Sequence, residues 1–337
     1  MMPADLFATL DRLDRLIALD VGNRGIEPLY TAARAQSTEA LTGKAAQMLL
    51  DVPQGGRVIA TTGSVSRAWI SGAIGENDGP SGAAAVIRAL VLARRAMIVV
   101  LIEEALIPAM SRVLEAAGLS VVDRPAARRA AEDGSMACVA LEPFPLTDEE
   151  GSEAAEAILD DIKPELLFST ERAGRNEKGI YYNMRGRDYG MERARIDMVF
   201  DAALVRGIPT LAVGDGGNEI GMGNVAEAVA RSIPFGAPGD CPCGGGIGAV
   251  SCTSHLVVAG VSNWGCTAIA AAMAAVTGDK RLLHSPEAED RLLEVMTAEG
   301  LINSAHGIID PHVDGLPKST HIAVAEMARS IIAPHLP

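Results

Sequence analysis

The chain has 337 residues, of which 48% are hydrophobic and 21% charged, so it is long enough to bury a full-sized core. Its formal net charge of −14 repels nucleic-acid phosphates and anionic lipids, so we expect neither partner and instead a small anionic metabolite. The first residues lack a signal-peptide pattern and the five cysteines are odd in number, which predicts a cytoplasmic protein with reduced thiols.

Helical and strand-like segments alternate along the chain. Apolar spacing predicts helices over residues 1–20 and 31–50. Short β-branched runs predict strands over residues 57–61, 97–102, 120–122, 136–141, 165–168, 209–213 and 256–259. Further helices are predicted over residues 81–95, 104–117, 148–162, 189–206, 264–276, 286–299 and 318–332.

This alternation predicts a Rossmann-like, doubly wound α/β fold, in which a mostly parallel sheet carries helices on both faces. We expect one domain over residues 1–337, with residues 1–50 as a helical N-terminal extension or cap. Polar segments directly follow four predicted strands, at residues 61–82, 169–187, 214–224 and 260–265. Because ligands bind outside the carboxyl ends of such strands, we expect these segments to form the site.

The glycine-rich segment at residues 214–224 is the sharpest of the four. Asp215 and Glu219 stand among its glycines, where a carboxylate meets a ligand without obstruction from neighbouring side chains. Two carboxylates beside amide oxygens suit Mg²⁺ or Mn²⁺, so both residues are candidate catalytic residues and metal ligands. The alternative is that Asp215 and Asn218 only cap a helix and shape the turn. Candidate substrate-binding residues here are Gly216, Gly217 and Asn218.

Neither common nucleotide motif fits this chain. The pattern G-x-G-x-x-G fails because the sixth position counted from Gly214 is Glu219. The phosphate-binding P-loop fails because Gly43-Lys44 is followed by Ala45, which has no hydroxyl. We therefore expect neither NAD nor ATP as a cofactor.

The segment at residues 170–187 contains four arginines, a lysine, two glutamates and two tyrosines. Arginine guanidinium groups suit carboxylates, so this loop is a candidate for binding a dicarboxylate, and a solvated surface loop is the alternative. Its candidate substrate-binding residues are Arg172, Arg175, Asn176, Lys178, Asn183 and Arg185.

Two other strand-end segments offer further candidates. Glu76 and Asp78 are candidate catalytic acids or bases, although the turn that they form could equally cap a helix. Ser262, Asn263 and Trp264 could form a wall of the substrate site, with core packing as the alternative.

Two cysteine- and histidine-containing segments give weaker signals. Cys241, Cys243 and Cys252 invite a zinc interpretation, but their spacing matches no common zinc motif. Residues 304–315 contain two histidines and two aspartates, and we expect surface structure there, with a rim loop of the site or a second metal site as the alternatives.

Four stretches, at residues 77–83, 171–186, 214–223 and 261–265, together resemble the C-terminal domain of the D-glutamate cyclase family. The resemblance extends over nearly the whole chain. It implies interconversion of D-glutamate and 5-oxo-D-proline, with water lost or gained, and a requirement for Mn²⁺ or Mg²⁺.

The candidate residues take definite roles in that reaction. A cation held by Asp215 and Glu219 would polarise the γ-carboxyl, and Glu76 or Asp78 would act as acid or base. The α-carboxylate would be bound by Arg172, Arg175 or Lys178.

Two other functions stay open from the sequence. One is a different metal-dependent hydrolase or lyase acting on a small carboxylate or phosphorylated metabolite. The other is a non-catalytic protein that binds an acidic metabolite. Homodimer formation is a further expectation that the sequence leaves open.

Overall fold

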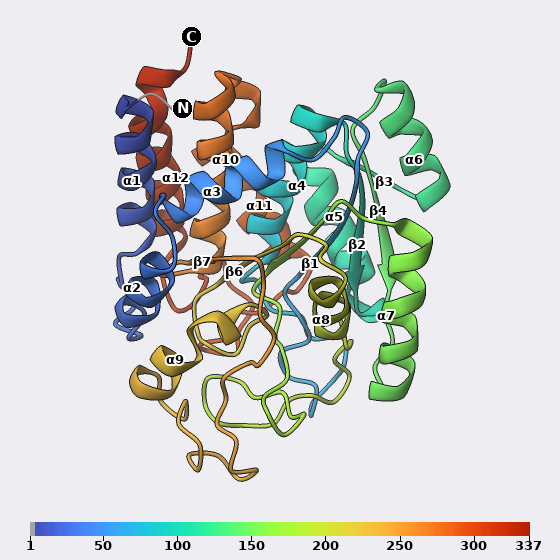
Figure 1. Cartoon of the computed structure of the whole chain (residues 1–337), viewed down its shortest axis with the longest axis vertical. Coiled ribbons are helices and arrows are strands. Elements are labelled where there is room, and N and C mark those ends of the chain that lie inside the picture. Colours follow the sequence, from blue (N-terminus) through green and yellow to red (C-terminus); the bar gives the residue numbers. More distant parts are fainter. Residues whose placement is uncertain (1–3) are drawn as a thin grey trace.

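The computed structural model describes residues 4–337 and contains one seven-stranded sheet. All neighbouring strands pair in parallel, in the order β3-β4-β2-β1-β5-β6-β7. The strands are β1 (Arg57–Thr62), β2 (Met97–Ile102), β3 (Ser120–Val122), β4 (Cys138–Pro143), β5 (Leu166–Thr170), β6 (Thr210–Gly214) and β7 (His255–Val258). Helices flank the sheet on both sides (Figure 1), which confirms the predicted doubly wound α/β fold.

The two faces of the sheet are covered by different helices. One face packs against α4 (Pro80–Arg94), α5 (Ile107–Ala116) and α10 (Ser262–Thr277), and the other against α6 (Arg124–Asp133), α7 (Asp148–Ile162) and α8 (Asp197–Val205). Successive residues of a strand point to opposite faces. Val58 and Ala60 of β1 accordingly join the first core and Ile59 the second. Burial on both faces explains why β1 and β2 are apolar without alternation.

A further layer of helices encloses α10. The helices α1 (Ala4–Ile17), α3 (Leu41–Leu50) and α12 (Lys318–Ile332) pack around it, and α11 (Pro286–Ala298) packs against α12 and α5. Small residues permit this close packing, since a Cβ atom on Gly82 of α4 would lie 2.9 Å from the Asn263 Cα atom of α10. The remaining helices are α2 (Glu27–Ala35), α9 (Ala226–Ser232), η1 (Glu104–Leu106), η2 (Met222–Val225), η3 (Lys280–Leu282) and η4 (Ala333–His335).

Several predicted helices differ from the observed ones. The helix predicted over residues 31–50 is two helices, α2 and α3, separated by residues 36–40. The helix predicted over residues 189–206 begins only at Asp197, because Arg193 stacks over the Tyr189 ring and donates to the Val65 carbonyl, which fixes the preceding residues as a loop. The helices α6 and α9 were not predicted.

The strand order creates a crevice beside β1. From β1 the chain moves outward to β2, and after β4 it returns to the opposite side of β1 to form β5. Ligands of open α/β sheets bind at such a reversal, outside the carboxyl ends of the strands. The long loops after β5 and after α9 gather at the end of the molecule away from the termini (Figure 1).

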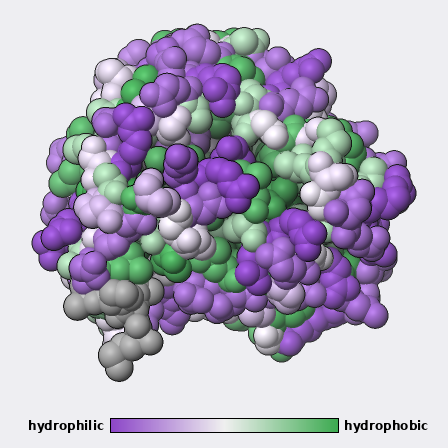
Figure 2. All heavy atoms as spheres, turned by 90° about the horizontal axis from the view of Figure 1, so that it is seen from above, coloured by the Kyte–Doolittle hydropathy of each residue, from purple (hydrophilic) through white to green (hydrophobic). Residues whose placement is uncertain are grey.

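Polar residues cover most of the opposite end of the molecule, where both termini lie, and apolar residues are scattered among them (Figure 2). Scattered apolar residues of this kind are normal on a protein surface. In residues 4–337, no helix combines the length and hydropathy that a membrane span requires.

The start of α3 depends on a residue of α1. Ala40, which precedes α3, has no side chain that could cap a helix. The buried Asp14 carboxylate instead accepts from the backbone N–H groups of Leu41 at 2.6 Å and Thr42 at 3.0 Å, and from the Thr42 hydroxyl at 2.6 Å. The cap therefore also joins two helices of the outer layer.

Asp14→Ala is expected to lower the free energy of unfolding by about 1–3 kcal/mol, because it leaves buried donors unsatisfied. Urea denaturation measures the loss. Asp11→Ala is the matched control, since it removes only a partly exposed ion pair with Arg34, and its cost should stay below about 1 kcal/mol. Equal losses in the two variants would contradict the capping role.

Candidate active site

A pocket of about 350 Å³ opens at the crevice beside β1. Its lining comes from residues 66–76 after β1, residues 171–189 after β5, Asn218 after β6, residues 304–314, and Arg24 from the turn between α1 and α2. Three of the four predicted strand-end segments thus contribute directly. The pocket also receives residues from both ends of the chain.

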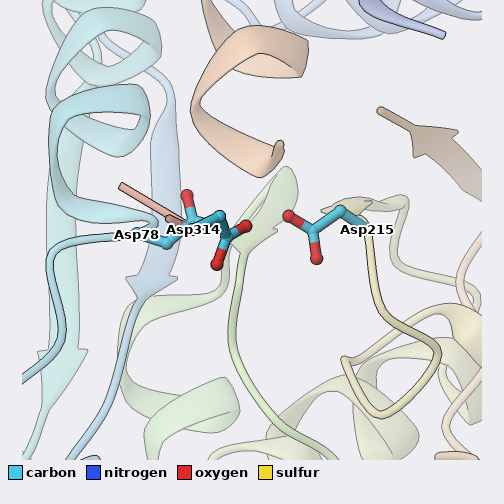
Figure 3. Close-up of side chains that lie close together, drawn as sticks. All are labelled: Asp78, Asp215 and Asp314. Carbon is cyan, nitrogen blue, oxygen red and sulfur yellow. The ribbon is translucent and has the colours of Figure 1, made fainter. Parts of the chain in front are cut away.

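Buried carboxylates gather beside this pocket, and two of them, Glu171 and Asp314, belong to its lining. The carboxylate oxygens of Asp78, Asp215 and Asp314 lie within 4.8 Å of one another, as do those of Glu171, Asp215 and Glu219. Figure 3 shows the Asp215 side chain pointing toward Asp78 and Asp314. Asp215 belongs to both groups, so these five residues form one acidic cluster.

Arg24 contacts this acidic cluster. It donates to both carboxylate oxygens of Asp215, at 2.8 and 3.1 Å, and also to Asp314. The Asp20 carboxylate fixes the turn that carries Arg24 by accepting from the backbone N–H groups of Arg24, Gly25 and Ile26. One guanidinium carries less charge than five carboxylates, so protons or a cation must neutralise part of the remainder.

The pKa values of the cluster diverge. Burial raises the pKa of Asp78 well above its usual range, and the charges of Asp314 and Glu171 raise it further. Burial also raises the pKa of Asp215, against the opposing effect of Arg24. For Asp314, burial is outweighed by Arg24 and by hydrogen bonds with Asp78 and Asp215, which lower its pKa. A protonated Asp78 beside an ionised Asp314 is the arrangement of an acid/base pair.

The hydrogen bonds of the Asp78 carboxylate indicate whether the acidic cluster could hold a cation. Its Oδ1 atom accepts from the Gly79 N–H group at 2.9 Å, whereas its buried Oδ2 atom has no donor among the described residues. The Oδ2 atom therefore needs either a proton shared with Asp314 or a positive ion. A buried site made of carboxylate oxygens suits a hard divalent cation such as Mg²⁺ or Mn²⁺.

Glu219 shapes the glycine-rich loop. Its carboxylate accepts from the backbone N–H groups of Gly216 and Gly217, each at 2.7 Å. A Cβ atom on Gly216 would lie 2.8 Å from Glu219 Oε1, so the loop requires glycine there. The N–H groups of Gly216 and Gly217, two residues predicted to bind the substrate, are thus satisfied within the loop, and neither residue lines the pocket. Asn218 does line the pocket, and its amide donates to the Tyr182 carbonyl and the Tyr189 hydroxyl.

Three arginines form the rim of the pocket. The Arg187 guanidinium stacks 3.6 Å from the centre of the Trp69 ring, and that of Arg67 lies 5.6 Å from it. Arg67 donates to the Ser304 carbonyl and Arg185 to the Ala305 carbonyl. Within residues 4–337, no carboxylate forms a salt bridge with any of the three. Burial and the repulsion of Arg185 and Arg187 lower the pKa of Arg67, as expected for cations gathered to receive an anion.

Two arginines predicted to bind the substrate lie elsewhere. Arg172 is fully buried, and its guanidinium donates to the Glu103 carboxylate at 2.6 and 2.8 Å. Arg175 forms salt bridges with Asp197 and Asp201, each at 2.6 Å. Their guanidinium groups are thus committed to carboxylates outside the pocket, and the structure corrects the predicted role of both.

Asn176 and Lys178 also lie outside the pocket. The Asn176 amide donates to the Gly246 carbonyl at 2.6 Å, and its oxygen accepts from two backbone N–H groups of its own turn. Lys178 is exposed and forms a salt bridge with Glu177. Of the candidates predicted in this loop, Asn183 and Arg185 do line the pocket.

Of the three candidates predicted at the start of α10, one touches the acidic cluster and two make structural contacts. The Ser262 hydroxyl donates to Glu171 at 2.6 Å, so Ser262 touches the acidic cluster. The side-chain oxygen of Asn263 accepts from the backbone N–H groups of Gly79 and Gly82, which ties α10 to the start of α4. Trp264 is buried and donates to His321 at 2.8 Å. Core packing, the alternative interpretation, is correct for Trp264.

Sequence reasoning missed several residues of the site. Glu171 lay inside a predicted segment but was not singled out, although it directly follows β5. Asp314 was expected in surface structure, and the structure corrects this by placing it in the acidic cluster. No sequence motif pointed to Arg24 or Arg67, since only the folded chain brings them to the pocket.

Comparison with known proteins gives two matches. A family model described as "D-glutamate cyclase-like, C-terminal" matches residues 13–329. The Homo sapiens protein named "D-glutamate cyclase, mitochondrial" is 30% identical over 355 residues. The match covers 95% of this chain and 51% of the human protein, so the chain spans about half the length of that relative.

The different positions of Arg172 and Arg185 predict different effects on stability. Arg172→Met should lower the free energy of unfolding by about 3–5 kcal/mol, because it leaves the buried Glu103 carboxylate unpaired. Arg185→Met, at the exposed rim, should change it by no more than about 0.5 kcal/mol. Urea denaturation of both variants tests the assignment, and a stable Arg172→Met protein would contradict it.

The buried carboxyl of Glu76 should make the free energy of unfolding depend on pH. Its carboxyl accepts from the Ser64 hydroxyl at 2.9 Å, and burial raises its pKa to about 7, against the opposing effect of Arg193. The folded state thus binds the Glu76 proton more tightly than the unfolded state, for which the pKa is 4.5. The contribution of Glu76 to stability therefore falls as the pH rises from 4.5 through 7.

Glu76→Gln removes this titration. Its stability relative to the unsubstituted protein should increase between about pH 5 and pH 8, by on the order of 3 kcal/mol. Urea denaturation across that range measures the difference. Glu104→Gln, at an exposed carboxyl, is the control and should show no such trend. A difference for Glu76→Gln that does not vary with pH would overturn the assignment.

Proposed function

The chain belongs to the family of D-glutamate cyclase-like C-terminal domains, and we propose that it is an enzyme interconverting D-glutamate, or a related small amino dicarboxylate, and 5-oxo-D-proline. One observation carries the proposal. A single pocket brings members of a buried acidic cluster together with a rim of arginines that form no salt bridge with a carboxylate of residues 4–337. Because the chain spans about half of its human relative, catalysis by this chain alone is part of the proposal.

The charges of the pocket complement those of the substrate class. An amino dicarboxylate carries one ammonium and two carboxylate groups. The guanidinium groups of Arg67, Arg185 and Arg187 suit a substrate carboxylate, with Asn183 beside them. The acidic cluster suits the ammonium group and attracts it into the pocket. This arrangement replaces the carboxylate site that the sequence placed on Arg172, Arg175 and Lys178.

The acidic cluster also suits the proton transfers of the reaction. In cyclisation, the α-amino nitrogen attacks the γ-carboxyl carbon, a C–N bond forms, and the departing oxygen leaves as water. The ammonium nitrogen must lose two protons in all, one before and one after its attack, and the ionised Asp314 can accept one of them. The leaving carboxylate oxygen must gain two protons, one of which Glu171, or Asp78 when no cation is bound, can donate because burial raises the pKa of each. Hydrolysis of the lactam uses the same groups in reverse.

We include a divalent cation, Mn²⁺ or Mg²⁺, in the proposal. Asp78, Asp215 and Asp314 would hold it, since the buried Asp78 Oδ2 atom has no donor among the described residues. The carboxylates of Glu219 and Asp215 already accept hydrogen bonds, Glu219 from backbone N–H groups and Asp215 from Arg24 and the Ser262 N–H group, so either would have to exchange such a contact for the cation. When bound, the cation would supply Lewis-acid polarisation of the γ-carboxyl or lactam carbonyl. Without it, Asp78 and Asp314 would share a proton and act as an acid/base pair.

Turnover of D-glutamate and 5-oxo-D-proline, with Mn²⁺ and with chelator, tests the proposal. Asp215→Asn is expected to lower kcat by about 10²-fold or more, because Asp215 belongs to both groups of three carboxylates that make up the acidic cluster. Glu104→Gln is the matched control and should retain activity. Arg185→Met should raise KM about tenfold with less effect on kcat, because it removes a charged contact to the substrate.

The possible outcomes separate the parts of the proposal. Full activity in the presence of chelator would reject the proposed cation but support the proposed cyclase activity. Ligand-induced thermal stabilisation without turnover would indicate the non-catalytic binding protein. Neither stabilisation nor turnover with either compound would overturn the substrate class. L-Glutamate, assayed in parallel, determines whether the pocket selects one enantiomer.

A further inference from the structure

Cys241 and Cys243 lie on one tight turn, away from the acidic cluster. The Gly244 N–H group donates to the Cys241 carbonyl at 2.8 Å, which closes a four-residue turn with Pro242 at its second position. Proline favours that position because its φ angle is already fixed. The two Sγ atoms are 3.7 Å apart, with Cys241 buried and Cys243 partly exposed. The turn therefore presents one accessible thiol directly beside a second one.

Hydrogen-bond donors surround the Cys243 sulfur. The Asn176 amide donates to it at 3.3 Å and the Gly245 N–H group at 3.4 Å. Burial would raise the pKa of Cys243, but hydrogen bonds from Tyr182, Gly245 and Asn176 lower it to about 7. The pKa of Cys241 is raised by burial and by its contact with Cys243. Near neutral pH Cys243 therefore forms a thiolate more readily than an ordinary cysteine does, beside a Cys241 that remains a thiol.

The other cysteines lack this environment. Burial raises the pKa values of Cys138, Cys252 and Cys266. Cys252, the third residue of the zinc interpretation, donates to the Val250 carbonyl at 3.7 Å. Its partial exposure makes it a suitable internal reference for Cys243.

We propose that Cys243 and Cys241 form a redox-modification site, in which Cys243 attacks small-molecule disulfides and Cys241 resolves the product. The Cys243 thiolate attacks one sulfur of a disulfide RSSR, forming a mixed disulfide and releasing RS⁻. The Cys241 thiol then loses its proton and attacks the Cys243 sulfur, which releases a second RS⁻. The two cysteines are oxidised to one intramolecular disulfide, and RSSR is reduced to two thiols.

Disulfide formation would also affect the segment beside the pocket. The two sulfurs must approach from 3.7 Å to about 2 Å, which draws Cys243 away from the Asn176 amide. Asn176 and Tyr182 belong to the same loop as Arg185, and the Tyr182 carbonyl accepts from Asn218 in the pocket. The disulfide is therefore expected to loosen this loop. The modification site itself does not depend on the proposed cyclase activity.

Oxidised glutathione, added to the reduced full-length chain, tests the proposal by mass spectrometry. The unsubstituted protein should form the Cys241–Cys243 disulfide, whereas Cys241→Ser should stop at the mixed disulfide on Cys243. Cys243 should react about fivefold faster than Cys252, since its larger thiolate fraction outweighs its lower nucleophilicity. Cys243→Ser should leave only the slower reaction of Cys252 with oxidised glutathione. Cys252→Ser, the matched control, should form the Cys241–Cys243 disulfide as the unsubstituted protein does.

Two results would overturn the proposal. One is equal reaction rates at Cys243 and Cys252. The other is an identical end product in the unsubstituted protein and in Cys241→Ser, which would show that Cys241 does not resolve the adduct. Hydrogen–deuterium exchange of residues 176–187 tests the effect on the loop, and the disulfide should raise exchange there. Because neither readout uses substrate turnover, failure here is distinguishable from failure of the cyclase proposal.

Discussion

The burial of several carboxylates in one small volume is the constraint on which the rest of this structure depends. Ionised carboxylates repel one another and lose hydration when they are buried, so such a cluster survives only with charge compensation. Asp78, Asp215 and Asp314 meet at the reversal of the strand order, each delivered by a different segment. Arg24 supplies part of the compensation, and protons, a cation or a substrate ammonium group would supply the remainder. The same unfavourable electrostatics thus explain both the raised pKa values and the proposed chemistry.

The outer helices have a direct connection to this site. The turn between α1 and α2 carries Arg24 into contact with Asp215. The helix α1 belongs to the layer around α10, and Ser262 at the start of α10 contacts both Glu171 and Asp215. The helices α1 and α10 therefore contribute both to the packing on one side of the sheet and to the position of charged groups at the pocket. Packing and electrostatics are coupled here through the ends of helices.

Arginines perform two different tasks in the loops around the pocket. Arg172 and Arg175 are each paired with carboxylates and hold the loop after β5 against the rest of the protein. Arg67, Arg185 and Arg187 instead contact a ring and carbonyl oxygens, which leaves their charge available to a ligand. The salt bridges of Arg172 and Arg175 thus anchor the same loop that carries Arg185 and Arg187 to the rim. A substrate site on a long loop requires such a scaffold, since a mobile loop loses more entropy on binding.

The sequence by itself determined the α/β fold and the position of Asp215 directly after a strand, where the candidate site was expected. These features are local, because hydrophobic periodicity defines each strand and a polar segment after a strand must lie at its carboxyl end. It could not distinguish Arg172 from Arg185, which share one loop and one side-chain chemistry. Only the tertiary structure decided that distinction, because Glu103, the partner of Arg172, lies far away in the sequence. It alone also brought Arg24 and Asp314, from opposite ends of the chain, to Asp215, since long-range contacts leave no local pattern.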